Sequence, residues 1–152
     1  MQPRAVVLED WPAPDTGGSA LVLRTGSRLI VVYGTGAAAS AVVTFARASI
    51  VKVGSPNDEA LGGHPLFSAG LRHYSVHKVE HSPWLQSPEQ QNSVHPQHDR
   101  TRFLKDKVHY LFALKEETVE CIVVEPDGTK PEIEVFASRQ EAHSRVKNGI
   151  DA

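Results

Sequence analysis

Residues 20–45 read ALVLRTGSRLIVVYGTGAAASAVVTF. Short runs of Val, Leu and Ile bounded by turn residues are typical of β-strands, and here they fall at Ala20–Arg24, Arg28–Tyr33 and Ala41–Phe45. The break at Thr25-Gly26-Ser27 is of the kind that joins two antiparallel strands in a hairpin. We therefore expect this stretch to belong to an antiparallel sheet.

The same strand pattern recurs on both sides of this stretch. Further strands are predicted at Ala5–Leu8, Ala48–Val53, Tyr74–Glu80, His109–Leu114, Thr118–Val124 and Glu132–Phe136. Asp127-Gly128 is a strong turn signal before the last of them. The expected fold class is α+β, with a mainly antiparallel sheet of about seven to nine strands that is curled or barrel-like. A split into two packed sheets is equally compatible with the strand spacing.

Two helices are expected beside the strands. Ser82 is a suitable cap for a middle helix with Pro83 at its first position, and that helix has to end at His95-Pro96. The C-terminal helix is the clearest, because Ser138 and Glu141 form a capping-box pattern. The chain shows no internal repeat or linker, so residues 1–152 are expected to form a single β-rich domain.

Composition limits the classes of partner. The chain has 152 residues, of which 16 are Lys or Arg and 18 are Asp or Glu, for a formal charge of −2. This balance gives neither the basic stripe typical of nucleic-acid binding nor a polybasic membrane segment, so we expect neither partner. One cysteine, Cys121, leaves no intramolecular disulfide, and no secretory signal is visible at the N-terminus. The expected location is the cytoplasm.

Gly34-Thr35-Gly36-Ala37-Ala38-Ala39 matches a G-x-G-x-x-A form of the dinucleotide-binding motif. In that motif the glycines lie at a strand-to-helix turn and an acidic residue follows about 20 positions later. Here the next segment is β-branched, and Asp58 and Glu59 fall in a turn-rich loop. The favoured interpretation is a glycine turn between two antiparallel strands.

Eight histidines raise the question of a metal site. His73, His77 and His81 are spaced by four, which on a strand places them on one face but about 13 Å apart, too far to share an ion. We therefore interpret them as a solvated row.

His95 and His98 form a better candidate pair because they flank Pro96 in a loop, where imidazoles can converge. Together with His64 they would give three nitrogen ligands for a metal ion, and Asp99 could orient one ring. Their spacing matches no specific metal signature, and the sequence names no cofactor.

Residues 54–70 form a long loop rich in Gly, Pro, Asn and Asp, and loops of this kind in compact domains are often functional. We expect the 55–64 and 92–98 loops to meet over one end of the sheet and bind a small polar ligand or a protein partner. The residues expected to bind are Asn57, Asp58, Glu59, His64, Asn92 and His95.

Three functions are compatible with these loops. The first is the binding module, for which a homo-oligomer interface is one form. The second is an enzyme in which Glu59 or Asp58 acts with His64 or His95 as an acid–base pair, with or without a divalent metal. The third is structural, with the loop folding over and sealing the end of the sheet.

Cys121 lies in the predicted strand 118–124, where successive side chains point to opposite faces. Val119, Cys121 and Val123 then share an apolar face, and Glu120 points away from it. We predict a buried, unreactive thiol.

The motif Gly54-Ser-Pro-Asn-Asp-Glu-Ala-Leu-Gly-Gly-His-Pro-Leu66 resembles a family of small, uncharacterised bacterial proteins. The resemblance covers roughly residues 21–124. Its other motifs are Ser82-Pro83-Trp84, Asn92, His95-Pro96, His98, His109-Tyr110 and Glu120-Cys121. The chain departs from the family pattern before Glu-Cys, where it has Ala113-Leu114-Lys115-Glu116-Glu117-Thr118. The resemblance implies no activity, and it directs attention to the 55–64 loop and to Asn92, His95 and His98.

Overall fold

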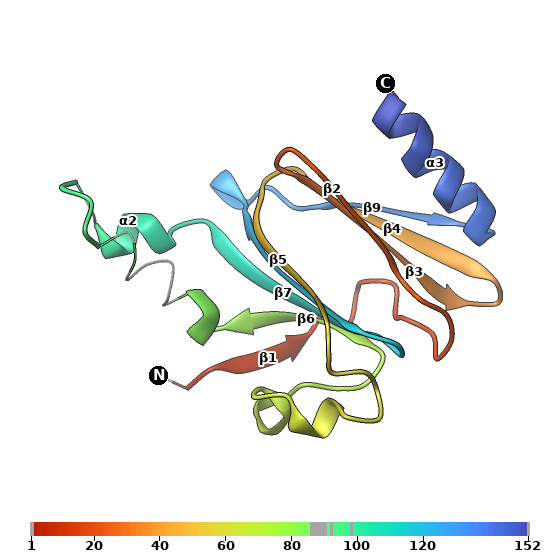
Figure 1. Cartoon of the computed structure of the whole chain (residues 1–152), viewed down its shortest axis with the longest axis horizontal. Coiled ribbons are helices and arrows are strands. Elements are labelled where there is room, and N and C mark those ends of the chain that lie inside the picture. The colour runs from red at the N-terminus through yellow and green to blue at the C-terminus, as the bar shows by residue number, and fades with distance from the viewer. Residues whose placement is uncertain (1, 86–90, 92, 98, 152) are drawn as a thin grey trace.

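The computed structural model describes residues 2–85, 91, 93–97 and 99–151. Two antiparallel sheets pack face to face (Figure 1). The five-stranded sheet has the order β1 (Arg4–Val7), β6 (Ser75–Glu80), β7 (Lys107–Ala113), β8 (Thr118–Val124) and β5 (Ala48–Gly54). The four-stranded sheet has the order β2 (Leu21–Thr25), β3 (Arg28–Gly36), β4 (Ala39–Phe45) and β9 (Glu132–Phe136).

The strands form where the alternating apolar pattern predicts them, with small shifts at their ends. Gly34–Ala39 proves to be the tip of the β3–β4 hairpin, in which Ala37 and Ala38 have φ values of 50° and 65°. Two successive positive φ values are characteristic of a tight hairpin turn. The interpretation of this motif as a turn between antiparallel strands is confirmed.

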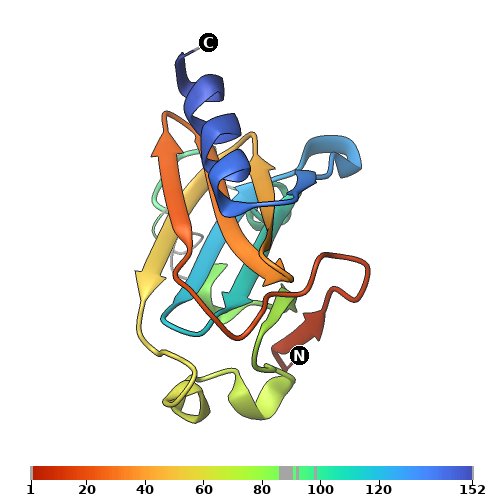
Figure 2. The same ribbon diagram turned by 90° about the vertical axis from the view of Figure 1, so that its right-hand side faces the viewer.

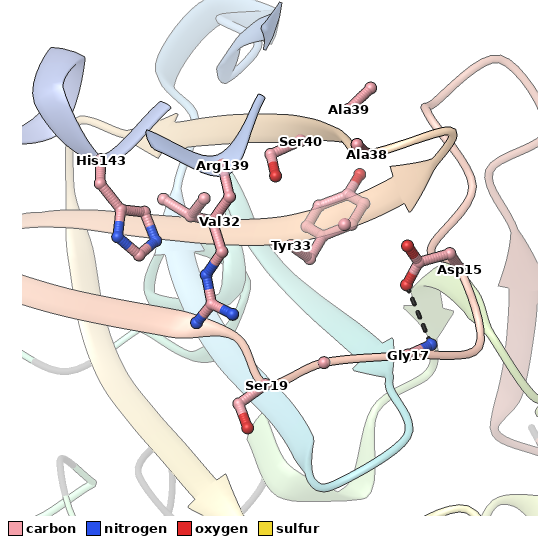
Figure 3. A pocket seen from close by; sticks show the side chains of 12 residues that line it. Asp15, Gly17, Ser19, Val32, Tyr33, Ala38, Ala39, Ser40, Arg139 and His143 are labelled. Carbon is pink, nitrogen blue, oxygen red and sulfur yellow. Dashed lines mark hydrogen bonds between the residues drawn. The ribbon is translucent and has the colours of Figure 1, made fainter. Parts of the chain in front are cut away.

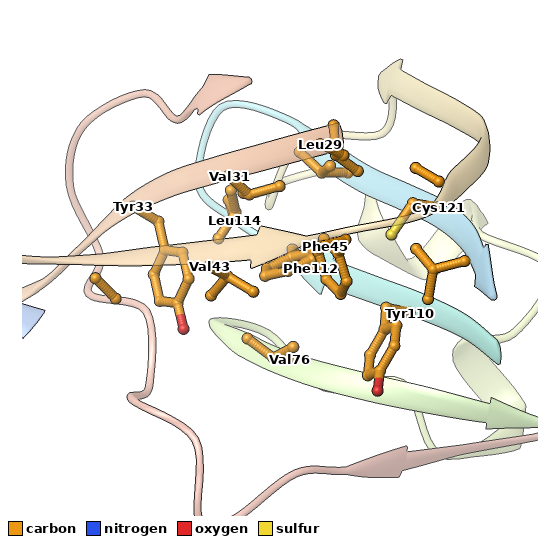
Figure 4. Packing of buried hydrophobic residues seen from close by; sticks show 14 residues of the cluster. Leu29, Val31, Tyr33, Val43, Phe45, Val76, Tyr110, Phe112, Leu114 and Cys121 are labelled. Carbon is orange, nitrogen blue, oxygen red and sulfur yellow. The ribbon is translucent and has the colours of Figure 1, made fainter. Parts of the chain in front are cut away.

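The main core lies between the two sheets (Figure 4). Alternate residues of each strand point into it, and Phe45 and Phe112 meet edge-to-face at 6.3 Å between ring centroids. Cys121 is fully buried there beside Val119 and Val123, as predicted. Burial raises the pKa of the Cys121 thiol well above its ordinary value, which makes a thiolate nucleophile unfavourable.

Each sheet is also covered on its outer face. Helix α3 (Arg139–Asp151) packs Ala142 and Val146 on the outer side of the four-stranded sheet (Figure 2). This explains why Ile30 and Val32 are buried together with their inward-facing neighbours on β3. The C-terminal helix is confirmed, and its first-turn amide of Glu141 is capped by the Ser138 hydroxyl at 3.1 Å.

The outer face of the five-stranded sheet is covered by residues 55–74, which we call the covering segment. It contains two short 3₁₀-helices, η1 (Leu61–Gly63) and η2 (Phe67–Ala69). Its leucines Leu61, Leu66 and Leu71 pack on Leu111 and on other apolar residues of that face. The segment is thus an ordered part of the structure with its own small core.

The expectation of a curled or barrel-like sheet needs correction, and the alternative of two packed sheets is confirmed. The described strands form no closed barrel, because β5 pairs with β8 and not with β4. The predicted middle helix falls largely on residues 86–90 and 92, which lie outside the described part, as does residue 98; the described residues of this region include the 3₁₀-helix η3 (Pro83–Leu85) and Gln91, which is helical. A further short helix that the sequence did not predict, α2 (Arg100–Leu104), follows this region, and the carboxylate of Asp99 caps it. Another short 3₁₀-helix, η4 (Pro126–Gly128), precedes β9.

Among the described residues, no helix has both the length and the apolar character needed to cross a membrane.

Candidate functional site

Two ionisable side chains project from the apolar outer face of the five-stranded sheet. His109 on β7 and Glu120 on β8 point away from the main core because their neighbours Tyr110 and Cys121 point into it. Both are nearly inaccessible, with relative exposures of 2% and 6%. A buried imidazole and a buried carboxylate need partners, since each would be costly alone.

Those partners form a continuous series of hydrogen bonds, which we call the polar chain: Ser82, His109, Glu120 and His64. The Ser82 Oγ lies 2.6 Å from His109 Nδ1, and His109 Nε2 lies 2.8 Å from Glu120 Oε1. The other carboxylate oxygen, Oε2, lies 3.0 Å from His64 Nε2. One carboxylate therefore holds two imidazoles at once.

The hydrogen bonds determine how protons are arranged in this chain. The backbone N–H of Leu66 donates to His64 Nδ1 at 3.0 Å, so that nitrogen carries no proton. The proton of a neutral His64 is then on Nε2, where it is donated to Glu120. His109 donates from Nε2 to the same carboxylate, which leaves its Nδ1 to accept the hydroxyl proton of Ser82.

Separate parts of the fold bring these groups together. His64 follows η1, whose last turn it closes with an N–H to the carbonyl of Leu61 at 2.9 Å. Ser82 follows β6 and comes directly after His81, which has a positive φ of 52°. A non-glycine residue in this conformation is strained, and such strain occurs preferentially at functional positions. Trp84 of η3 packs its ring against His109, with 5.0 Å between ring centroids.

Two opposing effects act on Glu120. Burial raises its pKa, but the hydrogen bonds from His109 and His64 outweigh that effect and hold the pKa at about 2. The carboxyl is therefore ionised at neutral pH. A fixed negative charge next to His109 stabilises any positive charge that the imidazole acquires.

This lowered pKa predicts an acid-sensitive fold. Because the folded-state pKa of Glu120 is about 2 against an ordinary 4.5, its contribution to stability is complete above the ordinary value. It is lost as the pH falls through the range from about 5 to about 2. Urea unfolding at a series of pH values should show this loss, and the Glu120→Gln variant should have a shallower slope in the same range. Equal slopes in the two proteins would contradict the assignment.

The structure uses the predicted loop residues mainly for internal contacts. Asn57 Oδ1 accepts the N–H of Ala60 at 3.1 Å, and Asp58 Oδ2 accepts the Tyr74 hydroxyl at 2.6 Å. The hydrogen bond from Tyr74 also lowers the pKa of Asp58. Glu59 is exposed, and no described residue hydrogen-bonds its carboxylate. Among the predicted binding residues that the structure describes, His64 alone belongs to the polar chain.

The predicted metal ligands fall in different surroundings. His95 is exposed and accepts the N–H of Gln97 at 3.1 Å, whereas both ring nitrogens of His64 have protein partners. Asn92 and His98 lie outside the described residues. Within the described part of the chain, no group of three His, Cys, Asp or Glu side chains is placed to hold an ion.

The interpretation of His73, His77 and His81 as a solvated row is wrong for its central member. His77 is fully buried, with Nε2 accepting the N–H of Arg72 at 3.0 Å and Nδ1 lying 3.1 Å from the carbonyl oxygen of Leu111. The covering segment lies over this part of β6, which the spacing of the histidines does not reveal. Burial accordingly lowers the pKa of His77.

Ser82, His109 and Glu120 are not among the predicted site residues, although all three fall in the motifs of the family resemblance. The sequence does contain an indication of the site: His109 in β7 and Glu120 in β8 each interrupt a run of apolar residues. Scans against models of known protein families, curated proteins and solved structures find no match to this chain.

Proposed function

We propose that the protein is an acid–base enzyme in which Ser82 is the nucleophile, His109 its general base and Glu120 the group that orients the base. The observation that carries the proposal is the unbroken series from Ser82 Oγ to His109 Nδ1 at 2.6 Å and from His109 Nε2 to Glu120 Oε1 at 2.8 Å. A nucleophile, a base and a third group that holds the base define this type of centre by geometry rather than by sequence order.

The chemistry that fits these groups is acyl transfer to water. Ser82 Oγ attacks the carbonyl carbon of an ester or related acyl substrate while its proton passes to His109 Nδ1. Glu120 stabilises the resulting imidazolium through Nε2. As the bond to the leaving group breaks, the proton on His109 passes to that group. A water molecule, deprotonated by His109 in the same way, then releases the acid and restores Ser82.

The extent of the polar chain also supports this proposal. A simple structural clip between the covering segment and the sheet requires only His64 and Glu120. The second imidazole and the hydroxyl are hydrogen-bonded members of the chain that such a clip does not need. Placing Ser82 after the strained residue His81 is a cost that a purely structural role does not require.

A binding module that uses the 55–64 and 92–98 segments is the second candidate function. The observation that favours it is the exposure of Glu59 and His95, together with Val94, which is 89% exposed. In this case the polar chain would only fix the covering segment, and a small polar ligand or a protein partner would bind outside it.

A serine-directed fluorophosphonate probe distinguishes the two candidates. We expect intact-mass analysis to show a single adduct on the wild-type protein and none on Ser82→Ala. Glu120→Gln should react about a hundredfold more slowly, because His109 Nδ1 then carries a proton and no longer serves as a base. The matched control is Ser68→Ala, which removes an exposed serine of the covering segment and should react like wild type.

Two results would contradict the enzyme function. One is an absence of labelling at any probe concentration that labels a standard serine hydrolase. The other is equal labelling of wild type and Ser82→Ala. Either result, in variants that remain folded by circular dichroism, would favour the binding module.

A further inference from the structure

A pocket of about 220 Å³ lies on the four-stranded sheet (Figure 3). None of its lining residues belongs to the polar chain. One wall is the end of the β3–β4 hairpin, and another is the loop from Asp15 to Ser19. The first turns of α3 close the third side with Arg139 and His143. Three separate parts of the chain thus converge on one cavity.

Ser40 provides a hydroxyl without a protein partner in this cavity. The residue is 3% exposed, and its side chain lines the pocket (Figure 3). No described residue forms a hydrogen bond with its Oγ. Because the hydroxyl faces the cavity and is not used inside the protein, it is available to hydrogen-bond a guest.

The wall formed by α3 is positively charged. Arg139 and His143 are four residues apart, which places their side chains on the same face of the helix, and both project toward the pocket (Figure 3). No described residue forms an ion pair with the Arg139 guanidinium. The start of a helix also carries partial positive charge from its free N–H groups. Arginine is well suited to bind planar carboxylates and phosphates through two hydrogen bonds.

The opposite wall is acidic and limits what the pocket accepts. Asp15 holds its own loop and the hairpin together, with Oδ1 accepting the N–H of Gly17 at 3.1 Å and Oδ2 accepting that of Gly36 at 3.2 Å. Its negative charge excludes a second anionic group from that end. The pocket is therefore suited to a guest with a single anionic group at the α3 wall.

We propose that this pocket binds a small molecule through one carboxylate or phosphate group, held by Arg139 and the Ser40 hydroxyl with His143 beside them. The volume is below the roughly 300–1,000 Å³ of sites for drug-sized ligands, so the guest is small. The site is separate from the polar chain and does not depend on the function proposed there.

The test uses inorganic phosphate and acetate as probes, titrated separately into ¹⁵N-labelled full-length protein at constant ionic strength. We expect saturable shifts of the Ser40 and Arg139 amide signals with at least one probe, and the better probe identifies the anion. Arg139→Gln should weaken that binding about tenfold, because a hydrogen bond to a charged group is lost.

Two control variants make the result decisive. Lys147→Gln removes the same charge from α3 outside the pocket and should leave binding unchanged. Ser40→Ala should weaken binding without lowering the melting temperature of the unliganded protein, because the hydroxyl has no partner there. The proposal is overturned if neither probe gives saturable shifts, or if Lys147→Gln weakens binding as much as Arg139→Gln, which would indicate nonspecific attraction.

Discussion

Replacing Glu120 with alanine is expected to lower the free energy of unfolding by about 3–5 kcal/mol. The substitution removes the one acceptor shared by His64 and His109, so two buried N–H groups lose their partner at once. It also removes the hydrogen bond of His64 to β8 and leaves a cavity between the covering segment and the sheet, although the bond from the Thr118 hydroxyl to the Pro56 carbonyl remains. Urea unfolding at neutral pH measures the effect, and a loss below about 1 kcal/mol would show that the polar chain contributes little to stability.

Glu120→Gln is the matched control because it keeps the shape of the side chain and removes its charge. The amide oxygen can accept from His64 Nε2, while the amide NH₂ can donate to His109 Nε2 if His109 moves its proton to Nδ1. That nitrogen would then donate to Ser82 Oγ instead of accepting from it. We expect this variant to lose less stability than Glu120→Ala because it can keep both hydrogen bonds, while it still loses the contribution of the charge that the low pKa of Glu120 indicates. A loss as large as that of Glu120→Ala would mean that the charge, and not the hydrogen-bond count, determines stability.

Much of the sheet structure could be predicted from local sequence alone. Alternation of apolar residues identifies the strands, and the turn at Gly26 and the glycine-containing tip of β3–β4 identify the hairpins. The partition into two sheets could not be predicted, because it depends on whether β5 pairs with β4 or with β8. The local sequence of β5 fits either pairing.

The site could be predicted from the sequence only in part, because its hydrogen-bonded partners are far apart along the chain. His64 and Glu120 are 56 residues apart, and Ser82 and His109 are 27 apart. Loop composition directs attention to residues 55–64, but it does not show which side chains turn inward. Asn57 and Asp58 form hydrogen bonds within the covering segment, whereas His64 forms one with Glu120 on the sheet. Sequence spacing contains no information about that difference.

Whether an ionisable residue within an apolar strand is buried depends on what covers its face of the sheet. The alternation in β8 places Glu120 and Cys121 on opposite faces of the sheet, as predicted. Sequence alone does not show that the outer face, which carries Glu120, is also buried, because that burial depends on the covering segment lying over it. His77 illustrates the same point in β6.

Gly70→Ala is expected to be as damaging as Glu120→Ala, for a reason that involves the backbone alone. Gly70 ends η2 with a φ of 106°, a conformation that alanine rarely adopts. An added Cβ would also overlap the carbonyl oxygen of Ala5 in β1. Backbone strain and overpacking together predict a loss of about 3–5 kcal/mol.

Gly62→Ala provides the comparison within the same covering segment. A Cβ at Gly62 meets no atom within 4 Å, and the residue has no left-handed φ, so the change should stay within about 0.5 kcal/mol of wild type. Equal stability of the two variants by urea unfolding would show that the contact of Gly70 with β1 is easily displaced. A large difference would mean that the covering segment is held at two places on the sheet, at the inner strand β8 through His64 and at the edge strand β1 through the close approach of Gly70. Since His64 is part of the polar chain, displacing the β1 anchor should also disturb the environment of His109, which the shift of its ring signals in NMR spectra would reveal.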